Sequence, residues 1–209
     1  MFSKMLNIGV SLFACASLTT AISANLLANP DIEGDYALWG PWANSFAEAD
    51  PLDENNTAMK MFGNWSGSFN VSGAFQQFAA VEGQTFEMSA KTLHVTGDEM
   101  TADGTEDNWV VMKLTFFDAA DAEISFVEEN ILDGNSPLDA WIDNAPMQAT
   151  APAGTAKVGA YIMYLQPMWD GGAAWIDDVV LTEVIPEPTS LALLSILSLG
   201  ALHRKRKTS

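Results

Sequence analysis

The sequence is poor in cysteine, histidine and arginine. Its one cysteine lies at position 15 and its two histidines at positions 94 and 203. One cysteine cannot form a disulfide within the chain, and so few thiol and imidazole groups argue against a zinc-type or other transition-metal site. No arginine lies between residues 25 and 185, and lysine occurs there only at positions 60, 91, 113 and 157. Nucleic acid is therefore excluded as a partner, because binding to phosphates depends on lysine and arginine.

Acidic residues, in contrast, are abundant. The 209 residues carry a formal net charge of −18. Residues 25–185 alone hold 26 acidic residues against four lysines, a net charge of −22. This middle part has the length of one compact domain. Because so strong a negative charge repels polyanions, a ligand of this domain is expected to be neutral unless calcium bridges the two.

The first 24 residues have the layout of a secretory signal peptide. Lys4 precedes an apolar stretch over residues 5–18, and small or polar residues follow up to Ala24. A basic start, a short apolar middle and a small residue at the cleavage position are typical of such signals. The sequence thus predicts export and cleavage after Ala24.

A second interpretation concerns Cys15. Residues 12–15 can be taken as a lipoprotein box in which Cys15 is lipidated, although Phe13 is bulky for such a box. In the first interpretation this cysteine is removed with the signal peptide. The mature chain would then contain no thiol.

Residues 185–209 combine three features in a fixed order. A Pro-Glu-Pro motif at Pro186, Glu187 and Pro188 precedes an apolar run over residues 189–202, and a basic tail follows. The run is marginal as a membrane-spanning helix, and the basic residues would hold its end in the cytoplasm. This order resembles the PEP-CTERM sorting signal of exported bacterial proteins; the alternative is a plain C-terminal anchor. The resemblance implies an exosortase that cuts at the motif, a transient inner-membrane anchor, and delivery to the cell surface or extracellular matrix, with Arg204 and Arg206 in the tail.

The middle of the chain shows strand periodicity. Over residues 110–116 one parity is wholly apolar and the other holds Val111, Lys113 and Thr115, apolar residues alternate with polar ones over 86–90, and both parities are apolar over 158–164. The first pattern is typical of half-buried strands, and the second indicates a central strand. Further strands are expected over residues 58–65, 74–81, 124–128 and 174–184. Eight or nine strands separated by Gly, Asp, Asn and Pro predict an all-β, antiparallel β-sandwich over residues 25–184, with helices in the two terminal signals.

The order of these segments resembles carbohydrate-binding modules with the galactose-binding-like jelly-roll fold. The segments that carry the resemblance are 29–33 (NPDIE) with Trp39, 73–78 (GAFQQF), 82–90 (EGQTFEMSA), 114–119 (LTFFDA), 151–156 (APAGTA) and 174–181 (AWIDDVVL). Each motif is weak alone, and the resemblance rests on their order and spacing. Ile32 stands where these modules usually have an aromatic residue. The resemblance implies a jelly-roll sandwich that binds polysaccharide.

The same resemblance implies one structural calcium where the first and last strands meet. Its ligands would be Glu33 and either Asp177 or Asp178. Adjacent residues on a strand point to opposite faces, so only one of the two aspartates is expected to reach the ion. The acidic loop over residues 97–108 lacks the ligand spacing of an EF-hand, and we interpret it as a solvated loop.

Aromatic residues are the candidates for sugar contacts. A flat aromatic ring buries the C–H face of a pyranose, while nearby amides and carboxylates bind its hydroxyls. Most of the seven tryptophans stand beside Gly, Pro, Asn or Asp, although Trp175, in the last predicted strand, is expected to be a packing residue and not a ligand contact. Strand parity would place the side chains of Tyr161 and Gln77 on one face of a sheet. The predicted ligand-binding residues are Trp42, Trp65, Trp109, Trp169, Tyr161 and Gln77.

The sequence contains no serine-centred elbow, phosphate-binding loop or histidine metal motif. We therefore expect an exported, non-catalytic module that binds an exopolysaccharide or an environmental glycan. One alternative is a structural or adhesive matrix protein that has kept the fold without a glycan site. A glycoside hydrolase is a further alternative, and it would need two carboxylates that face one cleft.

Overall fold

The computed structural model describes residues 23–185. Over this range the chain forms one short 3-10 helix, η1 (Tyr36–Trp39), ten strands and no α-helix. Within these residues no helix has the length and apolarity needed to cross a membrane. The predicted signal peptide with Cys15 and the predicted sorting signal with Pro186, Glu187, Pro188, Arg204 and Arg206 lie outside the described residues, as do the two predicted terminal helices.

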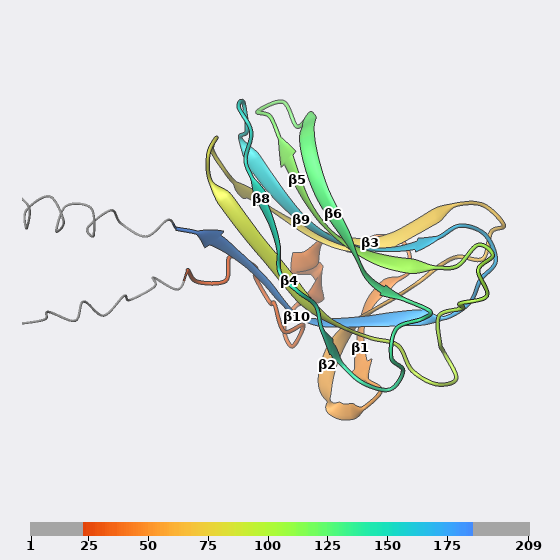
Figure 1. The fold of residues 1–209 in the computed structure, drawn as a ribbon. Coiled ribbons are helices and arrows are strands. Elements are labelled where there is room, and N and C mark those ends of the chain that lie inside the picture. The colour runs from red at the N-terminus through yellow and green to blue at the C-terminus, as the bar shows by residue number, and fades with distance from the viewer. Residues whose placement is uncertain (1–22, 186–209) are drawn as a thin grey trace, which may run out of the picture. The chain divides into compact units, whose positions relative to one another are not determined.

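The strands form two antiparallel sheets, which lie as two layers in Figure 1. Sheet A has the order β3-β9-β5-β6, and sheet B has the order β1-β2-β10-β4-β7, with β8 also paired to β4. Sheet A consists of β3 (Asn70–Ala79), β9 (Lys157–Gln166), β5 (Trp109–Phe117) and β6 (Glu123–Asp133). Sheet B consists of β1 (Ser45–Asp50), β2 (Asp53–Phe62), β10 (Ala173–Val184), β4 (Thr85–Leu93), β7 (Ile142–Asp143) and β8 (Met147–Thr150). The predicted all-β antiparallel sandwich is confirmed.

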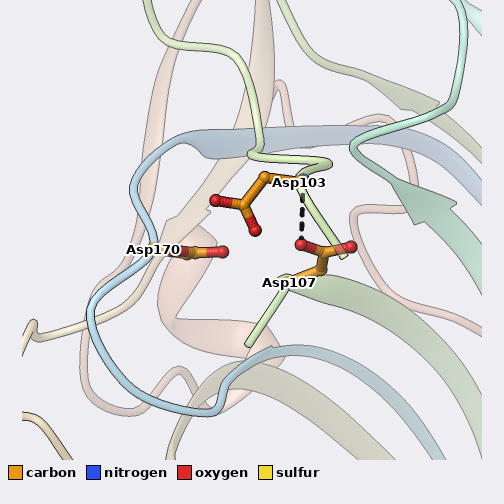
Figure 2. A group of neighbouring side chains, drawn as sticks. All are labelled: Asp103, Asp107 and Asp170. Atoms are coloured by element: carbon orange, nitrogen blue, oxygen red, sulfur yellow. Dashed lines mark hydrogen bonds between the residues drawn. The ribbon is translucent and has the colours of Figure 1, made fainter. Parts of the chain in front are cut away.

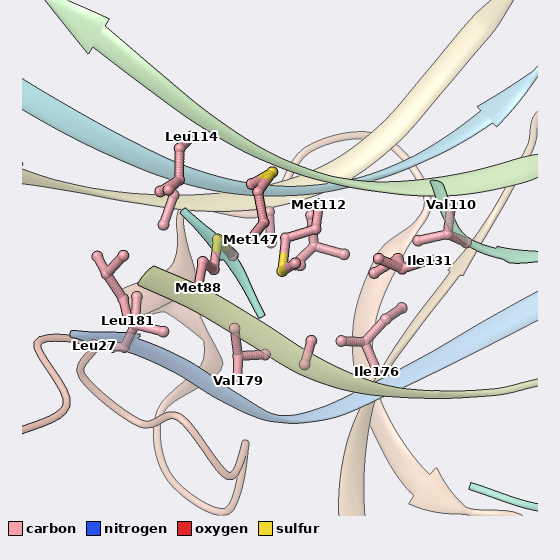
Figure 3. Close-up of a cluster of buried hydrophobic side chains, with 14 of the residues drawn as sticks. Leu27, Met88, Val110, Met112, Leu114, Ile131, Met147, Ile176, Val179 and Leu181 are labelled. Atoms are coloured by element: carbon pink, nitrogen blue, oxygen red, sulfur yellow. The ribbon is translucent and has the colours of Figure 1, made fainter. Parts of the chain in front are cut away.

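The core lies between the sheets and is built by alternate residues of each strand. On β5, Val110, Met112, Leu114 and Phe116 are all buried, as their spacing predicts. In Figure 3, Val110, Met112 and Leu114 face Met88 of β4 and other apolar side chains of sheet B. Because successive side chains point to opposite faces of a sheet, burying this set turns the intervening residues of sheet A outward.

The seven predicted strands correspond to β2, β3, β4, β5, β6, β9 and β10, and β9 has a neighbour on each side as expected. Strands β1, β7 and β8 were not predicted. β1 has mostly exposed residues and β7 has only two residues, so neither carries a clear alternation, and the alternation of β8 spans only four residues.

The two edges of sheet A differ. At β6 the eight residues from Glu123 to Asn130 are all exposed. At β3 the edge is partly covered, because the backbone of Trp42 forms an isolated bridge with Gly73. The Trp42 N–H donates to the Gly73 carbonyl at 2.9 Å, and the Gly73 N–H donates back at 3.3 Å.

A smaller apolar cluster lies on the outer face of sheet B. It contains Ala58, Leu93, Ala173 and Trp175, with Trp141 packed against it. Trp175 is therefore a packing residue, as predicted.

Candidate functional site

A groove of about 500 Å³ lies on the outer face of sheet A. Its side chains come from three adjacent strands and from the segments that flank them. Those on β3 and β9 are the outward members of the alternation that builds the core. The lining residues are Trp42, Phe75, Gln77, Phe117, Asp121, Lys157 and Tyr161.

Three aromatic rings form one wall of the groove. The rings of Phe75 and Tyr161 stack with centroids 5.1 Å apart and planes inclined by 10°. Trp42 stands against both, at 6.1 Å from Phe75 and edge-on at 6.5 Å from Tyr161. The stack follows from strand register, because Phe75 and Tyr161 are directly paired on β3 and β9. These three rings, the aromatic cradle, lie together on the outer face of sheet A and line the groove.

Two glycines make room for the rings. A Cβ atom at Gly73 would lie 2.4 Å from the indole of Trp42, and one at Gly159 would lie 2.5 Å from the ring of Tyr161. Such distances are below van der Waals contact, so any side chain at these positions would displace the ring. The absence of a side chain at the two glycines thus leaves the space that the rings of Trp42 and Tyr161 occupy.

Polar groups accompany the aromatic wall. Gln77 donates its amide N–H to the Tyr161 hydroxyl at 3.2 Å, and the Lys157 ammonium pairs directly with Asp121. Partial burial raises the pKa of Tyr161 further above its ordinary value, at which the hydroxyl is already protonated at neutral pH. The groove therefore offers hydroxyl, amide, ammonium and carboxylate groups around an apolar surface.

A second hollow of about 220 Å³ adjoins this groove and shares Tyr161 and Phe117 with it. It extends over β5 toward β6. Its further lining residues are Lys113, Thr115, Glu123 and Met163. The two hollows together cross the face of sheet A.

The structure brings together three of the six predicted ligand-binding residues. Trp42, Tyr161 and Gln77 line the groove. Trp65 stacks on Phe62 with centroids 5.5 Å apart, and it does not line the groove.

Trp169 and Trp109 are also outside the set that lines the groove. Trp169 is exposed and lies over Gly67. Trp109 begins β5 and is paired with Leu165, at the opposite end of that strand from Phe117.

Sequence reasoning missed Phe75, Phe117, Lys157 and Asp121. The same parity that selected Gln77 would have selected Phe75, two residues earlier on the strand. Phe117 follows the buried Phe116 directly, and alternation would have turned it outward. The pair between Lys157 and Asp121 joins distant segments, and no local pattern indicates it.

No family model matches the chain, and no curated protein matches it. Among solved structures, the enzymatically active domain of bacteriophage CBA120 tailspike protein 4 is 11% identical with a TM-score of 0.51, and the match covers 77% of this chain and 21% of that one. The chain thus spans about a fifth of the tailspike protein's length.

Carbohydrate-binding modules are also among the similar structures. TmCBM61 in complex with β-1,4-galactotriose is 16% identical with a TM-score of 0.48, and the match covers 77% of this chain and 99% of that one. The CBM22-1 xylan-binding domain of Paenibacillus barcinonensis Xyn10C is 13% identical with a TM-score of 0.49, with coverage of 81% and 99%. At these identities the likeness extends to the β-sandwich fold alone.

The three predicted calcium ligands have different surroundings. Asp177 is buried on β10, where it accepts an N–H from Asn56 at 3.0 Å, and burial is the main reason that its pKa is raised. Asp178 is exposed and pairs with Lys91 at 2.8 Å. A bulge with a positive φ of 47° at Asp178 separates the two side chains. Glu33 accepts the backbone N–H of Thr57 at 2.6 Å, next to Asn56.

These contacts bear on whether a calcium ion fits. Asp177 and Glu33 accept hydrogen bonds from the adjacent residues Asn56 and Thr57, so both carboxylates contact the same part of β2. Calcium prefers such carboxylate oxygens together with backbone carbonyls. Glu33 and Asp177 therefore fit the predicted site better than Asp178, whose carboxylate is held by Lys91.

The acidic loop predicted to be solvated contributes to a carboxylate cluster. Asp103 and Asp107 of this loop and Asp170 place one oxygen each within 4.8 Å of one another (Figure 2). Asp107 accepts the backbone N–H of Asp103 at 3.1 Å. Desolvation and the negative charges of Asp103, Asp107 and Glu106 raise the pKa of Asp170.

We expect the variant Asp170→Asn to be more stable than the wild type at pH 7. A carboxyl group whose pKa is higher in the folded than in the unfolded chain lowers stability above that pKa, and this loss disappears as the pH falls through it. Removing the charge should raise Tm by about 2 °C at pH 7, with solvent screening taken into account. Thermal unfolding at pH 7 and pH 4 measures this, and the gain should shrink at pH 4.

The matched control for this prediction is Glu82→Gln. It removes one charge from an exposed turn with no neighbouring acidic cluster. An equal rise in Tm for both variants would contradict local repulsion at Asp170 and point to net charge alone.

Proposed function

We propose that the domain is a non-catalytic carbohydrate-binding module whose ligand lies in the groove of sheet A. The single observation that carries this proposal is the aromatic cradle of Trp42, Phe75 and Tyr161, with polar groups beside it. A pyranose has an apolar C–H face and a rim of hydroxyls. The three rings can pack against the C–H face of the sugar. Gln77, Lys157 and Asp121 can form hydrogen bonds with its hydroxyls.

The groove supports binding over the two alternatives. A matrix protein without a glycan site would have its aromatic residues buried or scattered, whereas three rings gather here on one outer face. A hydrolase would need a carboxyl group that holds its proton as a general acid. The two acids that line the hollows, Asp121 and Glu123, each form an ion pair with a lysine.

Binding can be tested by affinity electrophoresis of the full chain in gels that contain xylan, β-1,4-galactan, β-glucan or polygalacturonate. We expect retardation by at least one of the neutral polysaccharides. Because polygalacturonate is a polyanion, the negative domain should migrate through it unretarded. No retardation in any gel, with or without calcium, would contradict the proposal.

Export and sorting complete the proposed function. The layouts of residues 1–24 and 185–209 support secretion, a transient membrane anchor and exosortase cleavage at Pro186, Glu187 and Pro188. In this arrangement the acidic domain would work at the cell surface or in the extracellular matrix, on an exopolysaccharide or an environmental glycan. Replacing Glu187 by Ala and following the size and location of the chain in a cell that has an exosortase would test the cleavage.

We also propose one structural calcium bound by Glu33 and Asp177. An ion that binds only the folded chain raises its stability by RT ln(1 + [Ca]/Kd), about 2.7 kcal/mol at a hundredfold excess over Kd. Calcium should therefore raise Tm by several degrees over a chelator, about 2–4 °C for each kcal/mol. Asp177→Asn should abolish this difference.

The matched control is Asp178→Asn. Because the Asp178 carboxylate is held by Lys91, this variant should leave the response to calcium intact. Loss of the response in Asp170→Asn, with Asp177→Asn unaffected, would place the ion at the other carboxylate cluster. A chelator that leaves the wild-type Tm unchanged would contradict a stabilising calcium altogether.

A further inference from the structure

The hollow beside the aromatic cradle contains a lysine and a glutamate that face each other without a hydrogen bond. We propose that Lys113 and Glu123 form a second sugar subsite that binds two neighbouring hydroxyls of a pyranose. The groove would then take a neutral glycan chain of at least two units. This inference rests on the proposed carbohydrate-binding function and names the class of glycan.

The strand register places this subsite in line with the cradle. Phe75 on β3 is paired with Tyr161 on β9, and Tyr161 is paired with Lys113 on β5. The three residues therefore form a row across the strands, with neighbouring strands about 4.8 Å apart. This spacing is similar to the length of one sugar unit in an extended chain. A sugar stacked on the cradle would place the next unit of its chain above Lys113.

The side chains of Lys113 and Glu123 have unused capacity for hydrogen bonds. The Lys113 ammonium lies 3.7 Å from the Glu123 carboxylate, too far for a hydrogen bond, and 3.8 Å from the centre of the Phe126 ring. Among residues 23–185 neither the Lys113 side chain nor the Glu123 side chain takes part in any hydrogen bond. The Lys113 side chain is only 18% exposed, so its three donors have limited access to water.

Lys157, which lines the groove, differs from Lys113 in its hydrogen bonding. Lys157 forms a direct hydrogen-bonded pair with Asp121. This bond uses one donor of Lys157 and holds its ammonium beside Asp121, whereas the gap between Lys113 and Glu123 leaves all three donors of Lys113 and the Glu123 carboxylate free to bind a ligand. Lys157 thus lines the groove and Lys113 the adjoining hollow, and of these two lysines only Lys113 lacks a hydrogen-bond partner among the described residues.

Neighbouring hydroxyls of a sugar fit this gap in chemical terms. One hydroxyl oxygen accepts a hydrogen bond from the Lys113 ammonium, and the next hydroxyl donates to the Glu123 carboxylate. Both bonds involve a charged group and are stronger than bonds between neutral groups. An acidic sugar fits poorly, because its carboxylate would approach Glu123 and Glu128, and Glu128 is the cross-strand partner of Lys113 on β6. The subsite therefore selects a neutral sugar with two adjacent free hydroxyls.

The test compares sugars of different length on the full chain. Isothermal titration would use xylose, xylobiose and xylotriose, and the matching series from galactose to galactotriose and from glucose to cellotriose. We expect Lys113→Met and Glu123→Gln each to weaken trisaccharide binding about tenfold, since a hydrogen bond to a charged group contributes roughly 1.5 kcal/mol. Binding of the monosaccharide, which occupies the cradle alone, should not change. Methylation of the 2- and 3-hydroxyls of the trisaccharide should cause a similar loss in the wild type and no further loss in the variants.

The control is Lys91→Met, which removes a lysine that pairs with Asp178 away from the groove and should bind like the wild type. Equal losses for monosaccharide and trisaccharide, or no loss for either, would overturn the second subsite while leaving the cradle in place. Tighter binding of polygalacturonate than of any neutral glycan would overturn the choice of a neutral sugar. If the wild type binds none of the sugars, the proposed function itself fails, and the subsite with it.

Discussion

The variant Tyr161→Ala is expected to lose most of the affinity for glycan. Tyr161 lines both hollows, stacks on Phe75 at 5.1 Å and stands next to Lys113 across the strands. Central aromatic residues of a binding site commonly contribute 2 kcal/mol or more, which corresponds to about a 30-fold loss of affinity. Affinity electrophoresis against the neutral polysaccharide that retards the wild type most strongly measures this loss, and titration gives its magnitude.

Two further variants serve as comparisons. One tests the hydroxyl of Tyr161, and the other tests an exposed ring outside the groove. Tyr161→Phe keeps the ring and loses only the hydroxyl that accepts from Gln77, so it should retain most of the affinity. Trp65→Ala removes an exposed ring that does not line the groove, and it should bind like the wild type. If Trp65→Ala lost affinity and Tyr161→Ala kept it, the ligand would lie near Trp65 and the groove would be wrong. Tyr161 is half-buried, so a thermal melt should show all three variants folded.

The largest expected loss of stability follows from Trp39→Ala. Trp39 ends η1 and is fully buried in the core cluster, and its indole N–H donates to the Asn29 carbonyl at 2.8 Å. Replacing a buried tryptophan by alanine leaves a cavity and costs about 4 kcal/mol. For a domain of this size we expect Tm to fall by about 10 °C.

Trp169→Ala is the matched control for this loss. It deletes the same side chain at a position that is 60% exposed, and surface substitutions usually change stability by less than about 0.5 kcal/mol. Urea unfolding of both variants, followed by fluorescence and by circular dichroism, gives the two free energies. Similar values would contradict the assignment of Trp39 to the core. The comparison also shows whether the segment before β1, which Trp39 anchors through Asn29, is part of the cooperative fold.

The fold was predictable because its strands alternate. On β5 and β4 apolar residues occupy every second position, and one face of each strand is buried, so the period of two is visible without any knowledge of the partner strands. β1 was not predicted from the sequence, because its four central residues are all exposed. Its place at the edge of sheet B depends on pairing with β2, and the spacing within β1 does not encode that pairing.

The groove was predictable only in part. Parity identified Tyr161 and Gln77, and the turn-like surroundings of Trp42 indicated a ring outside the core. The same kind of surroundings, with Asn64 beside Trp65 and Asp170 beside Trp169, also selected these two exposed tryptophans, and only the fold decides which rings meet. The row of Phe75, Tyr161 and Lys113 joins three strands through their registers, and no single segment contains that information.

The exposed edge at β6 affects how copies of this domain behave beside one another. An open strand edge presents unpaired backbone groups that can pair with the edge of another molecule. Here the edge carries Glu123, Glu128 and Glu129, and a second copy would bring the same three charges against them. The opposite edge is partly closed by the backbone of Trp42 at Gly73. Crowded copies therefore repel one another along β6 and keep the face of sheet A open to solvent.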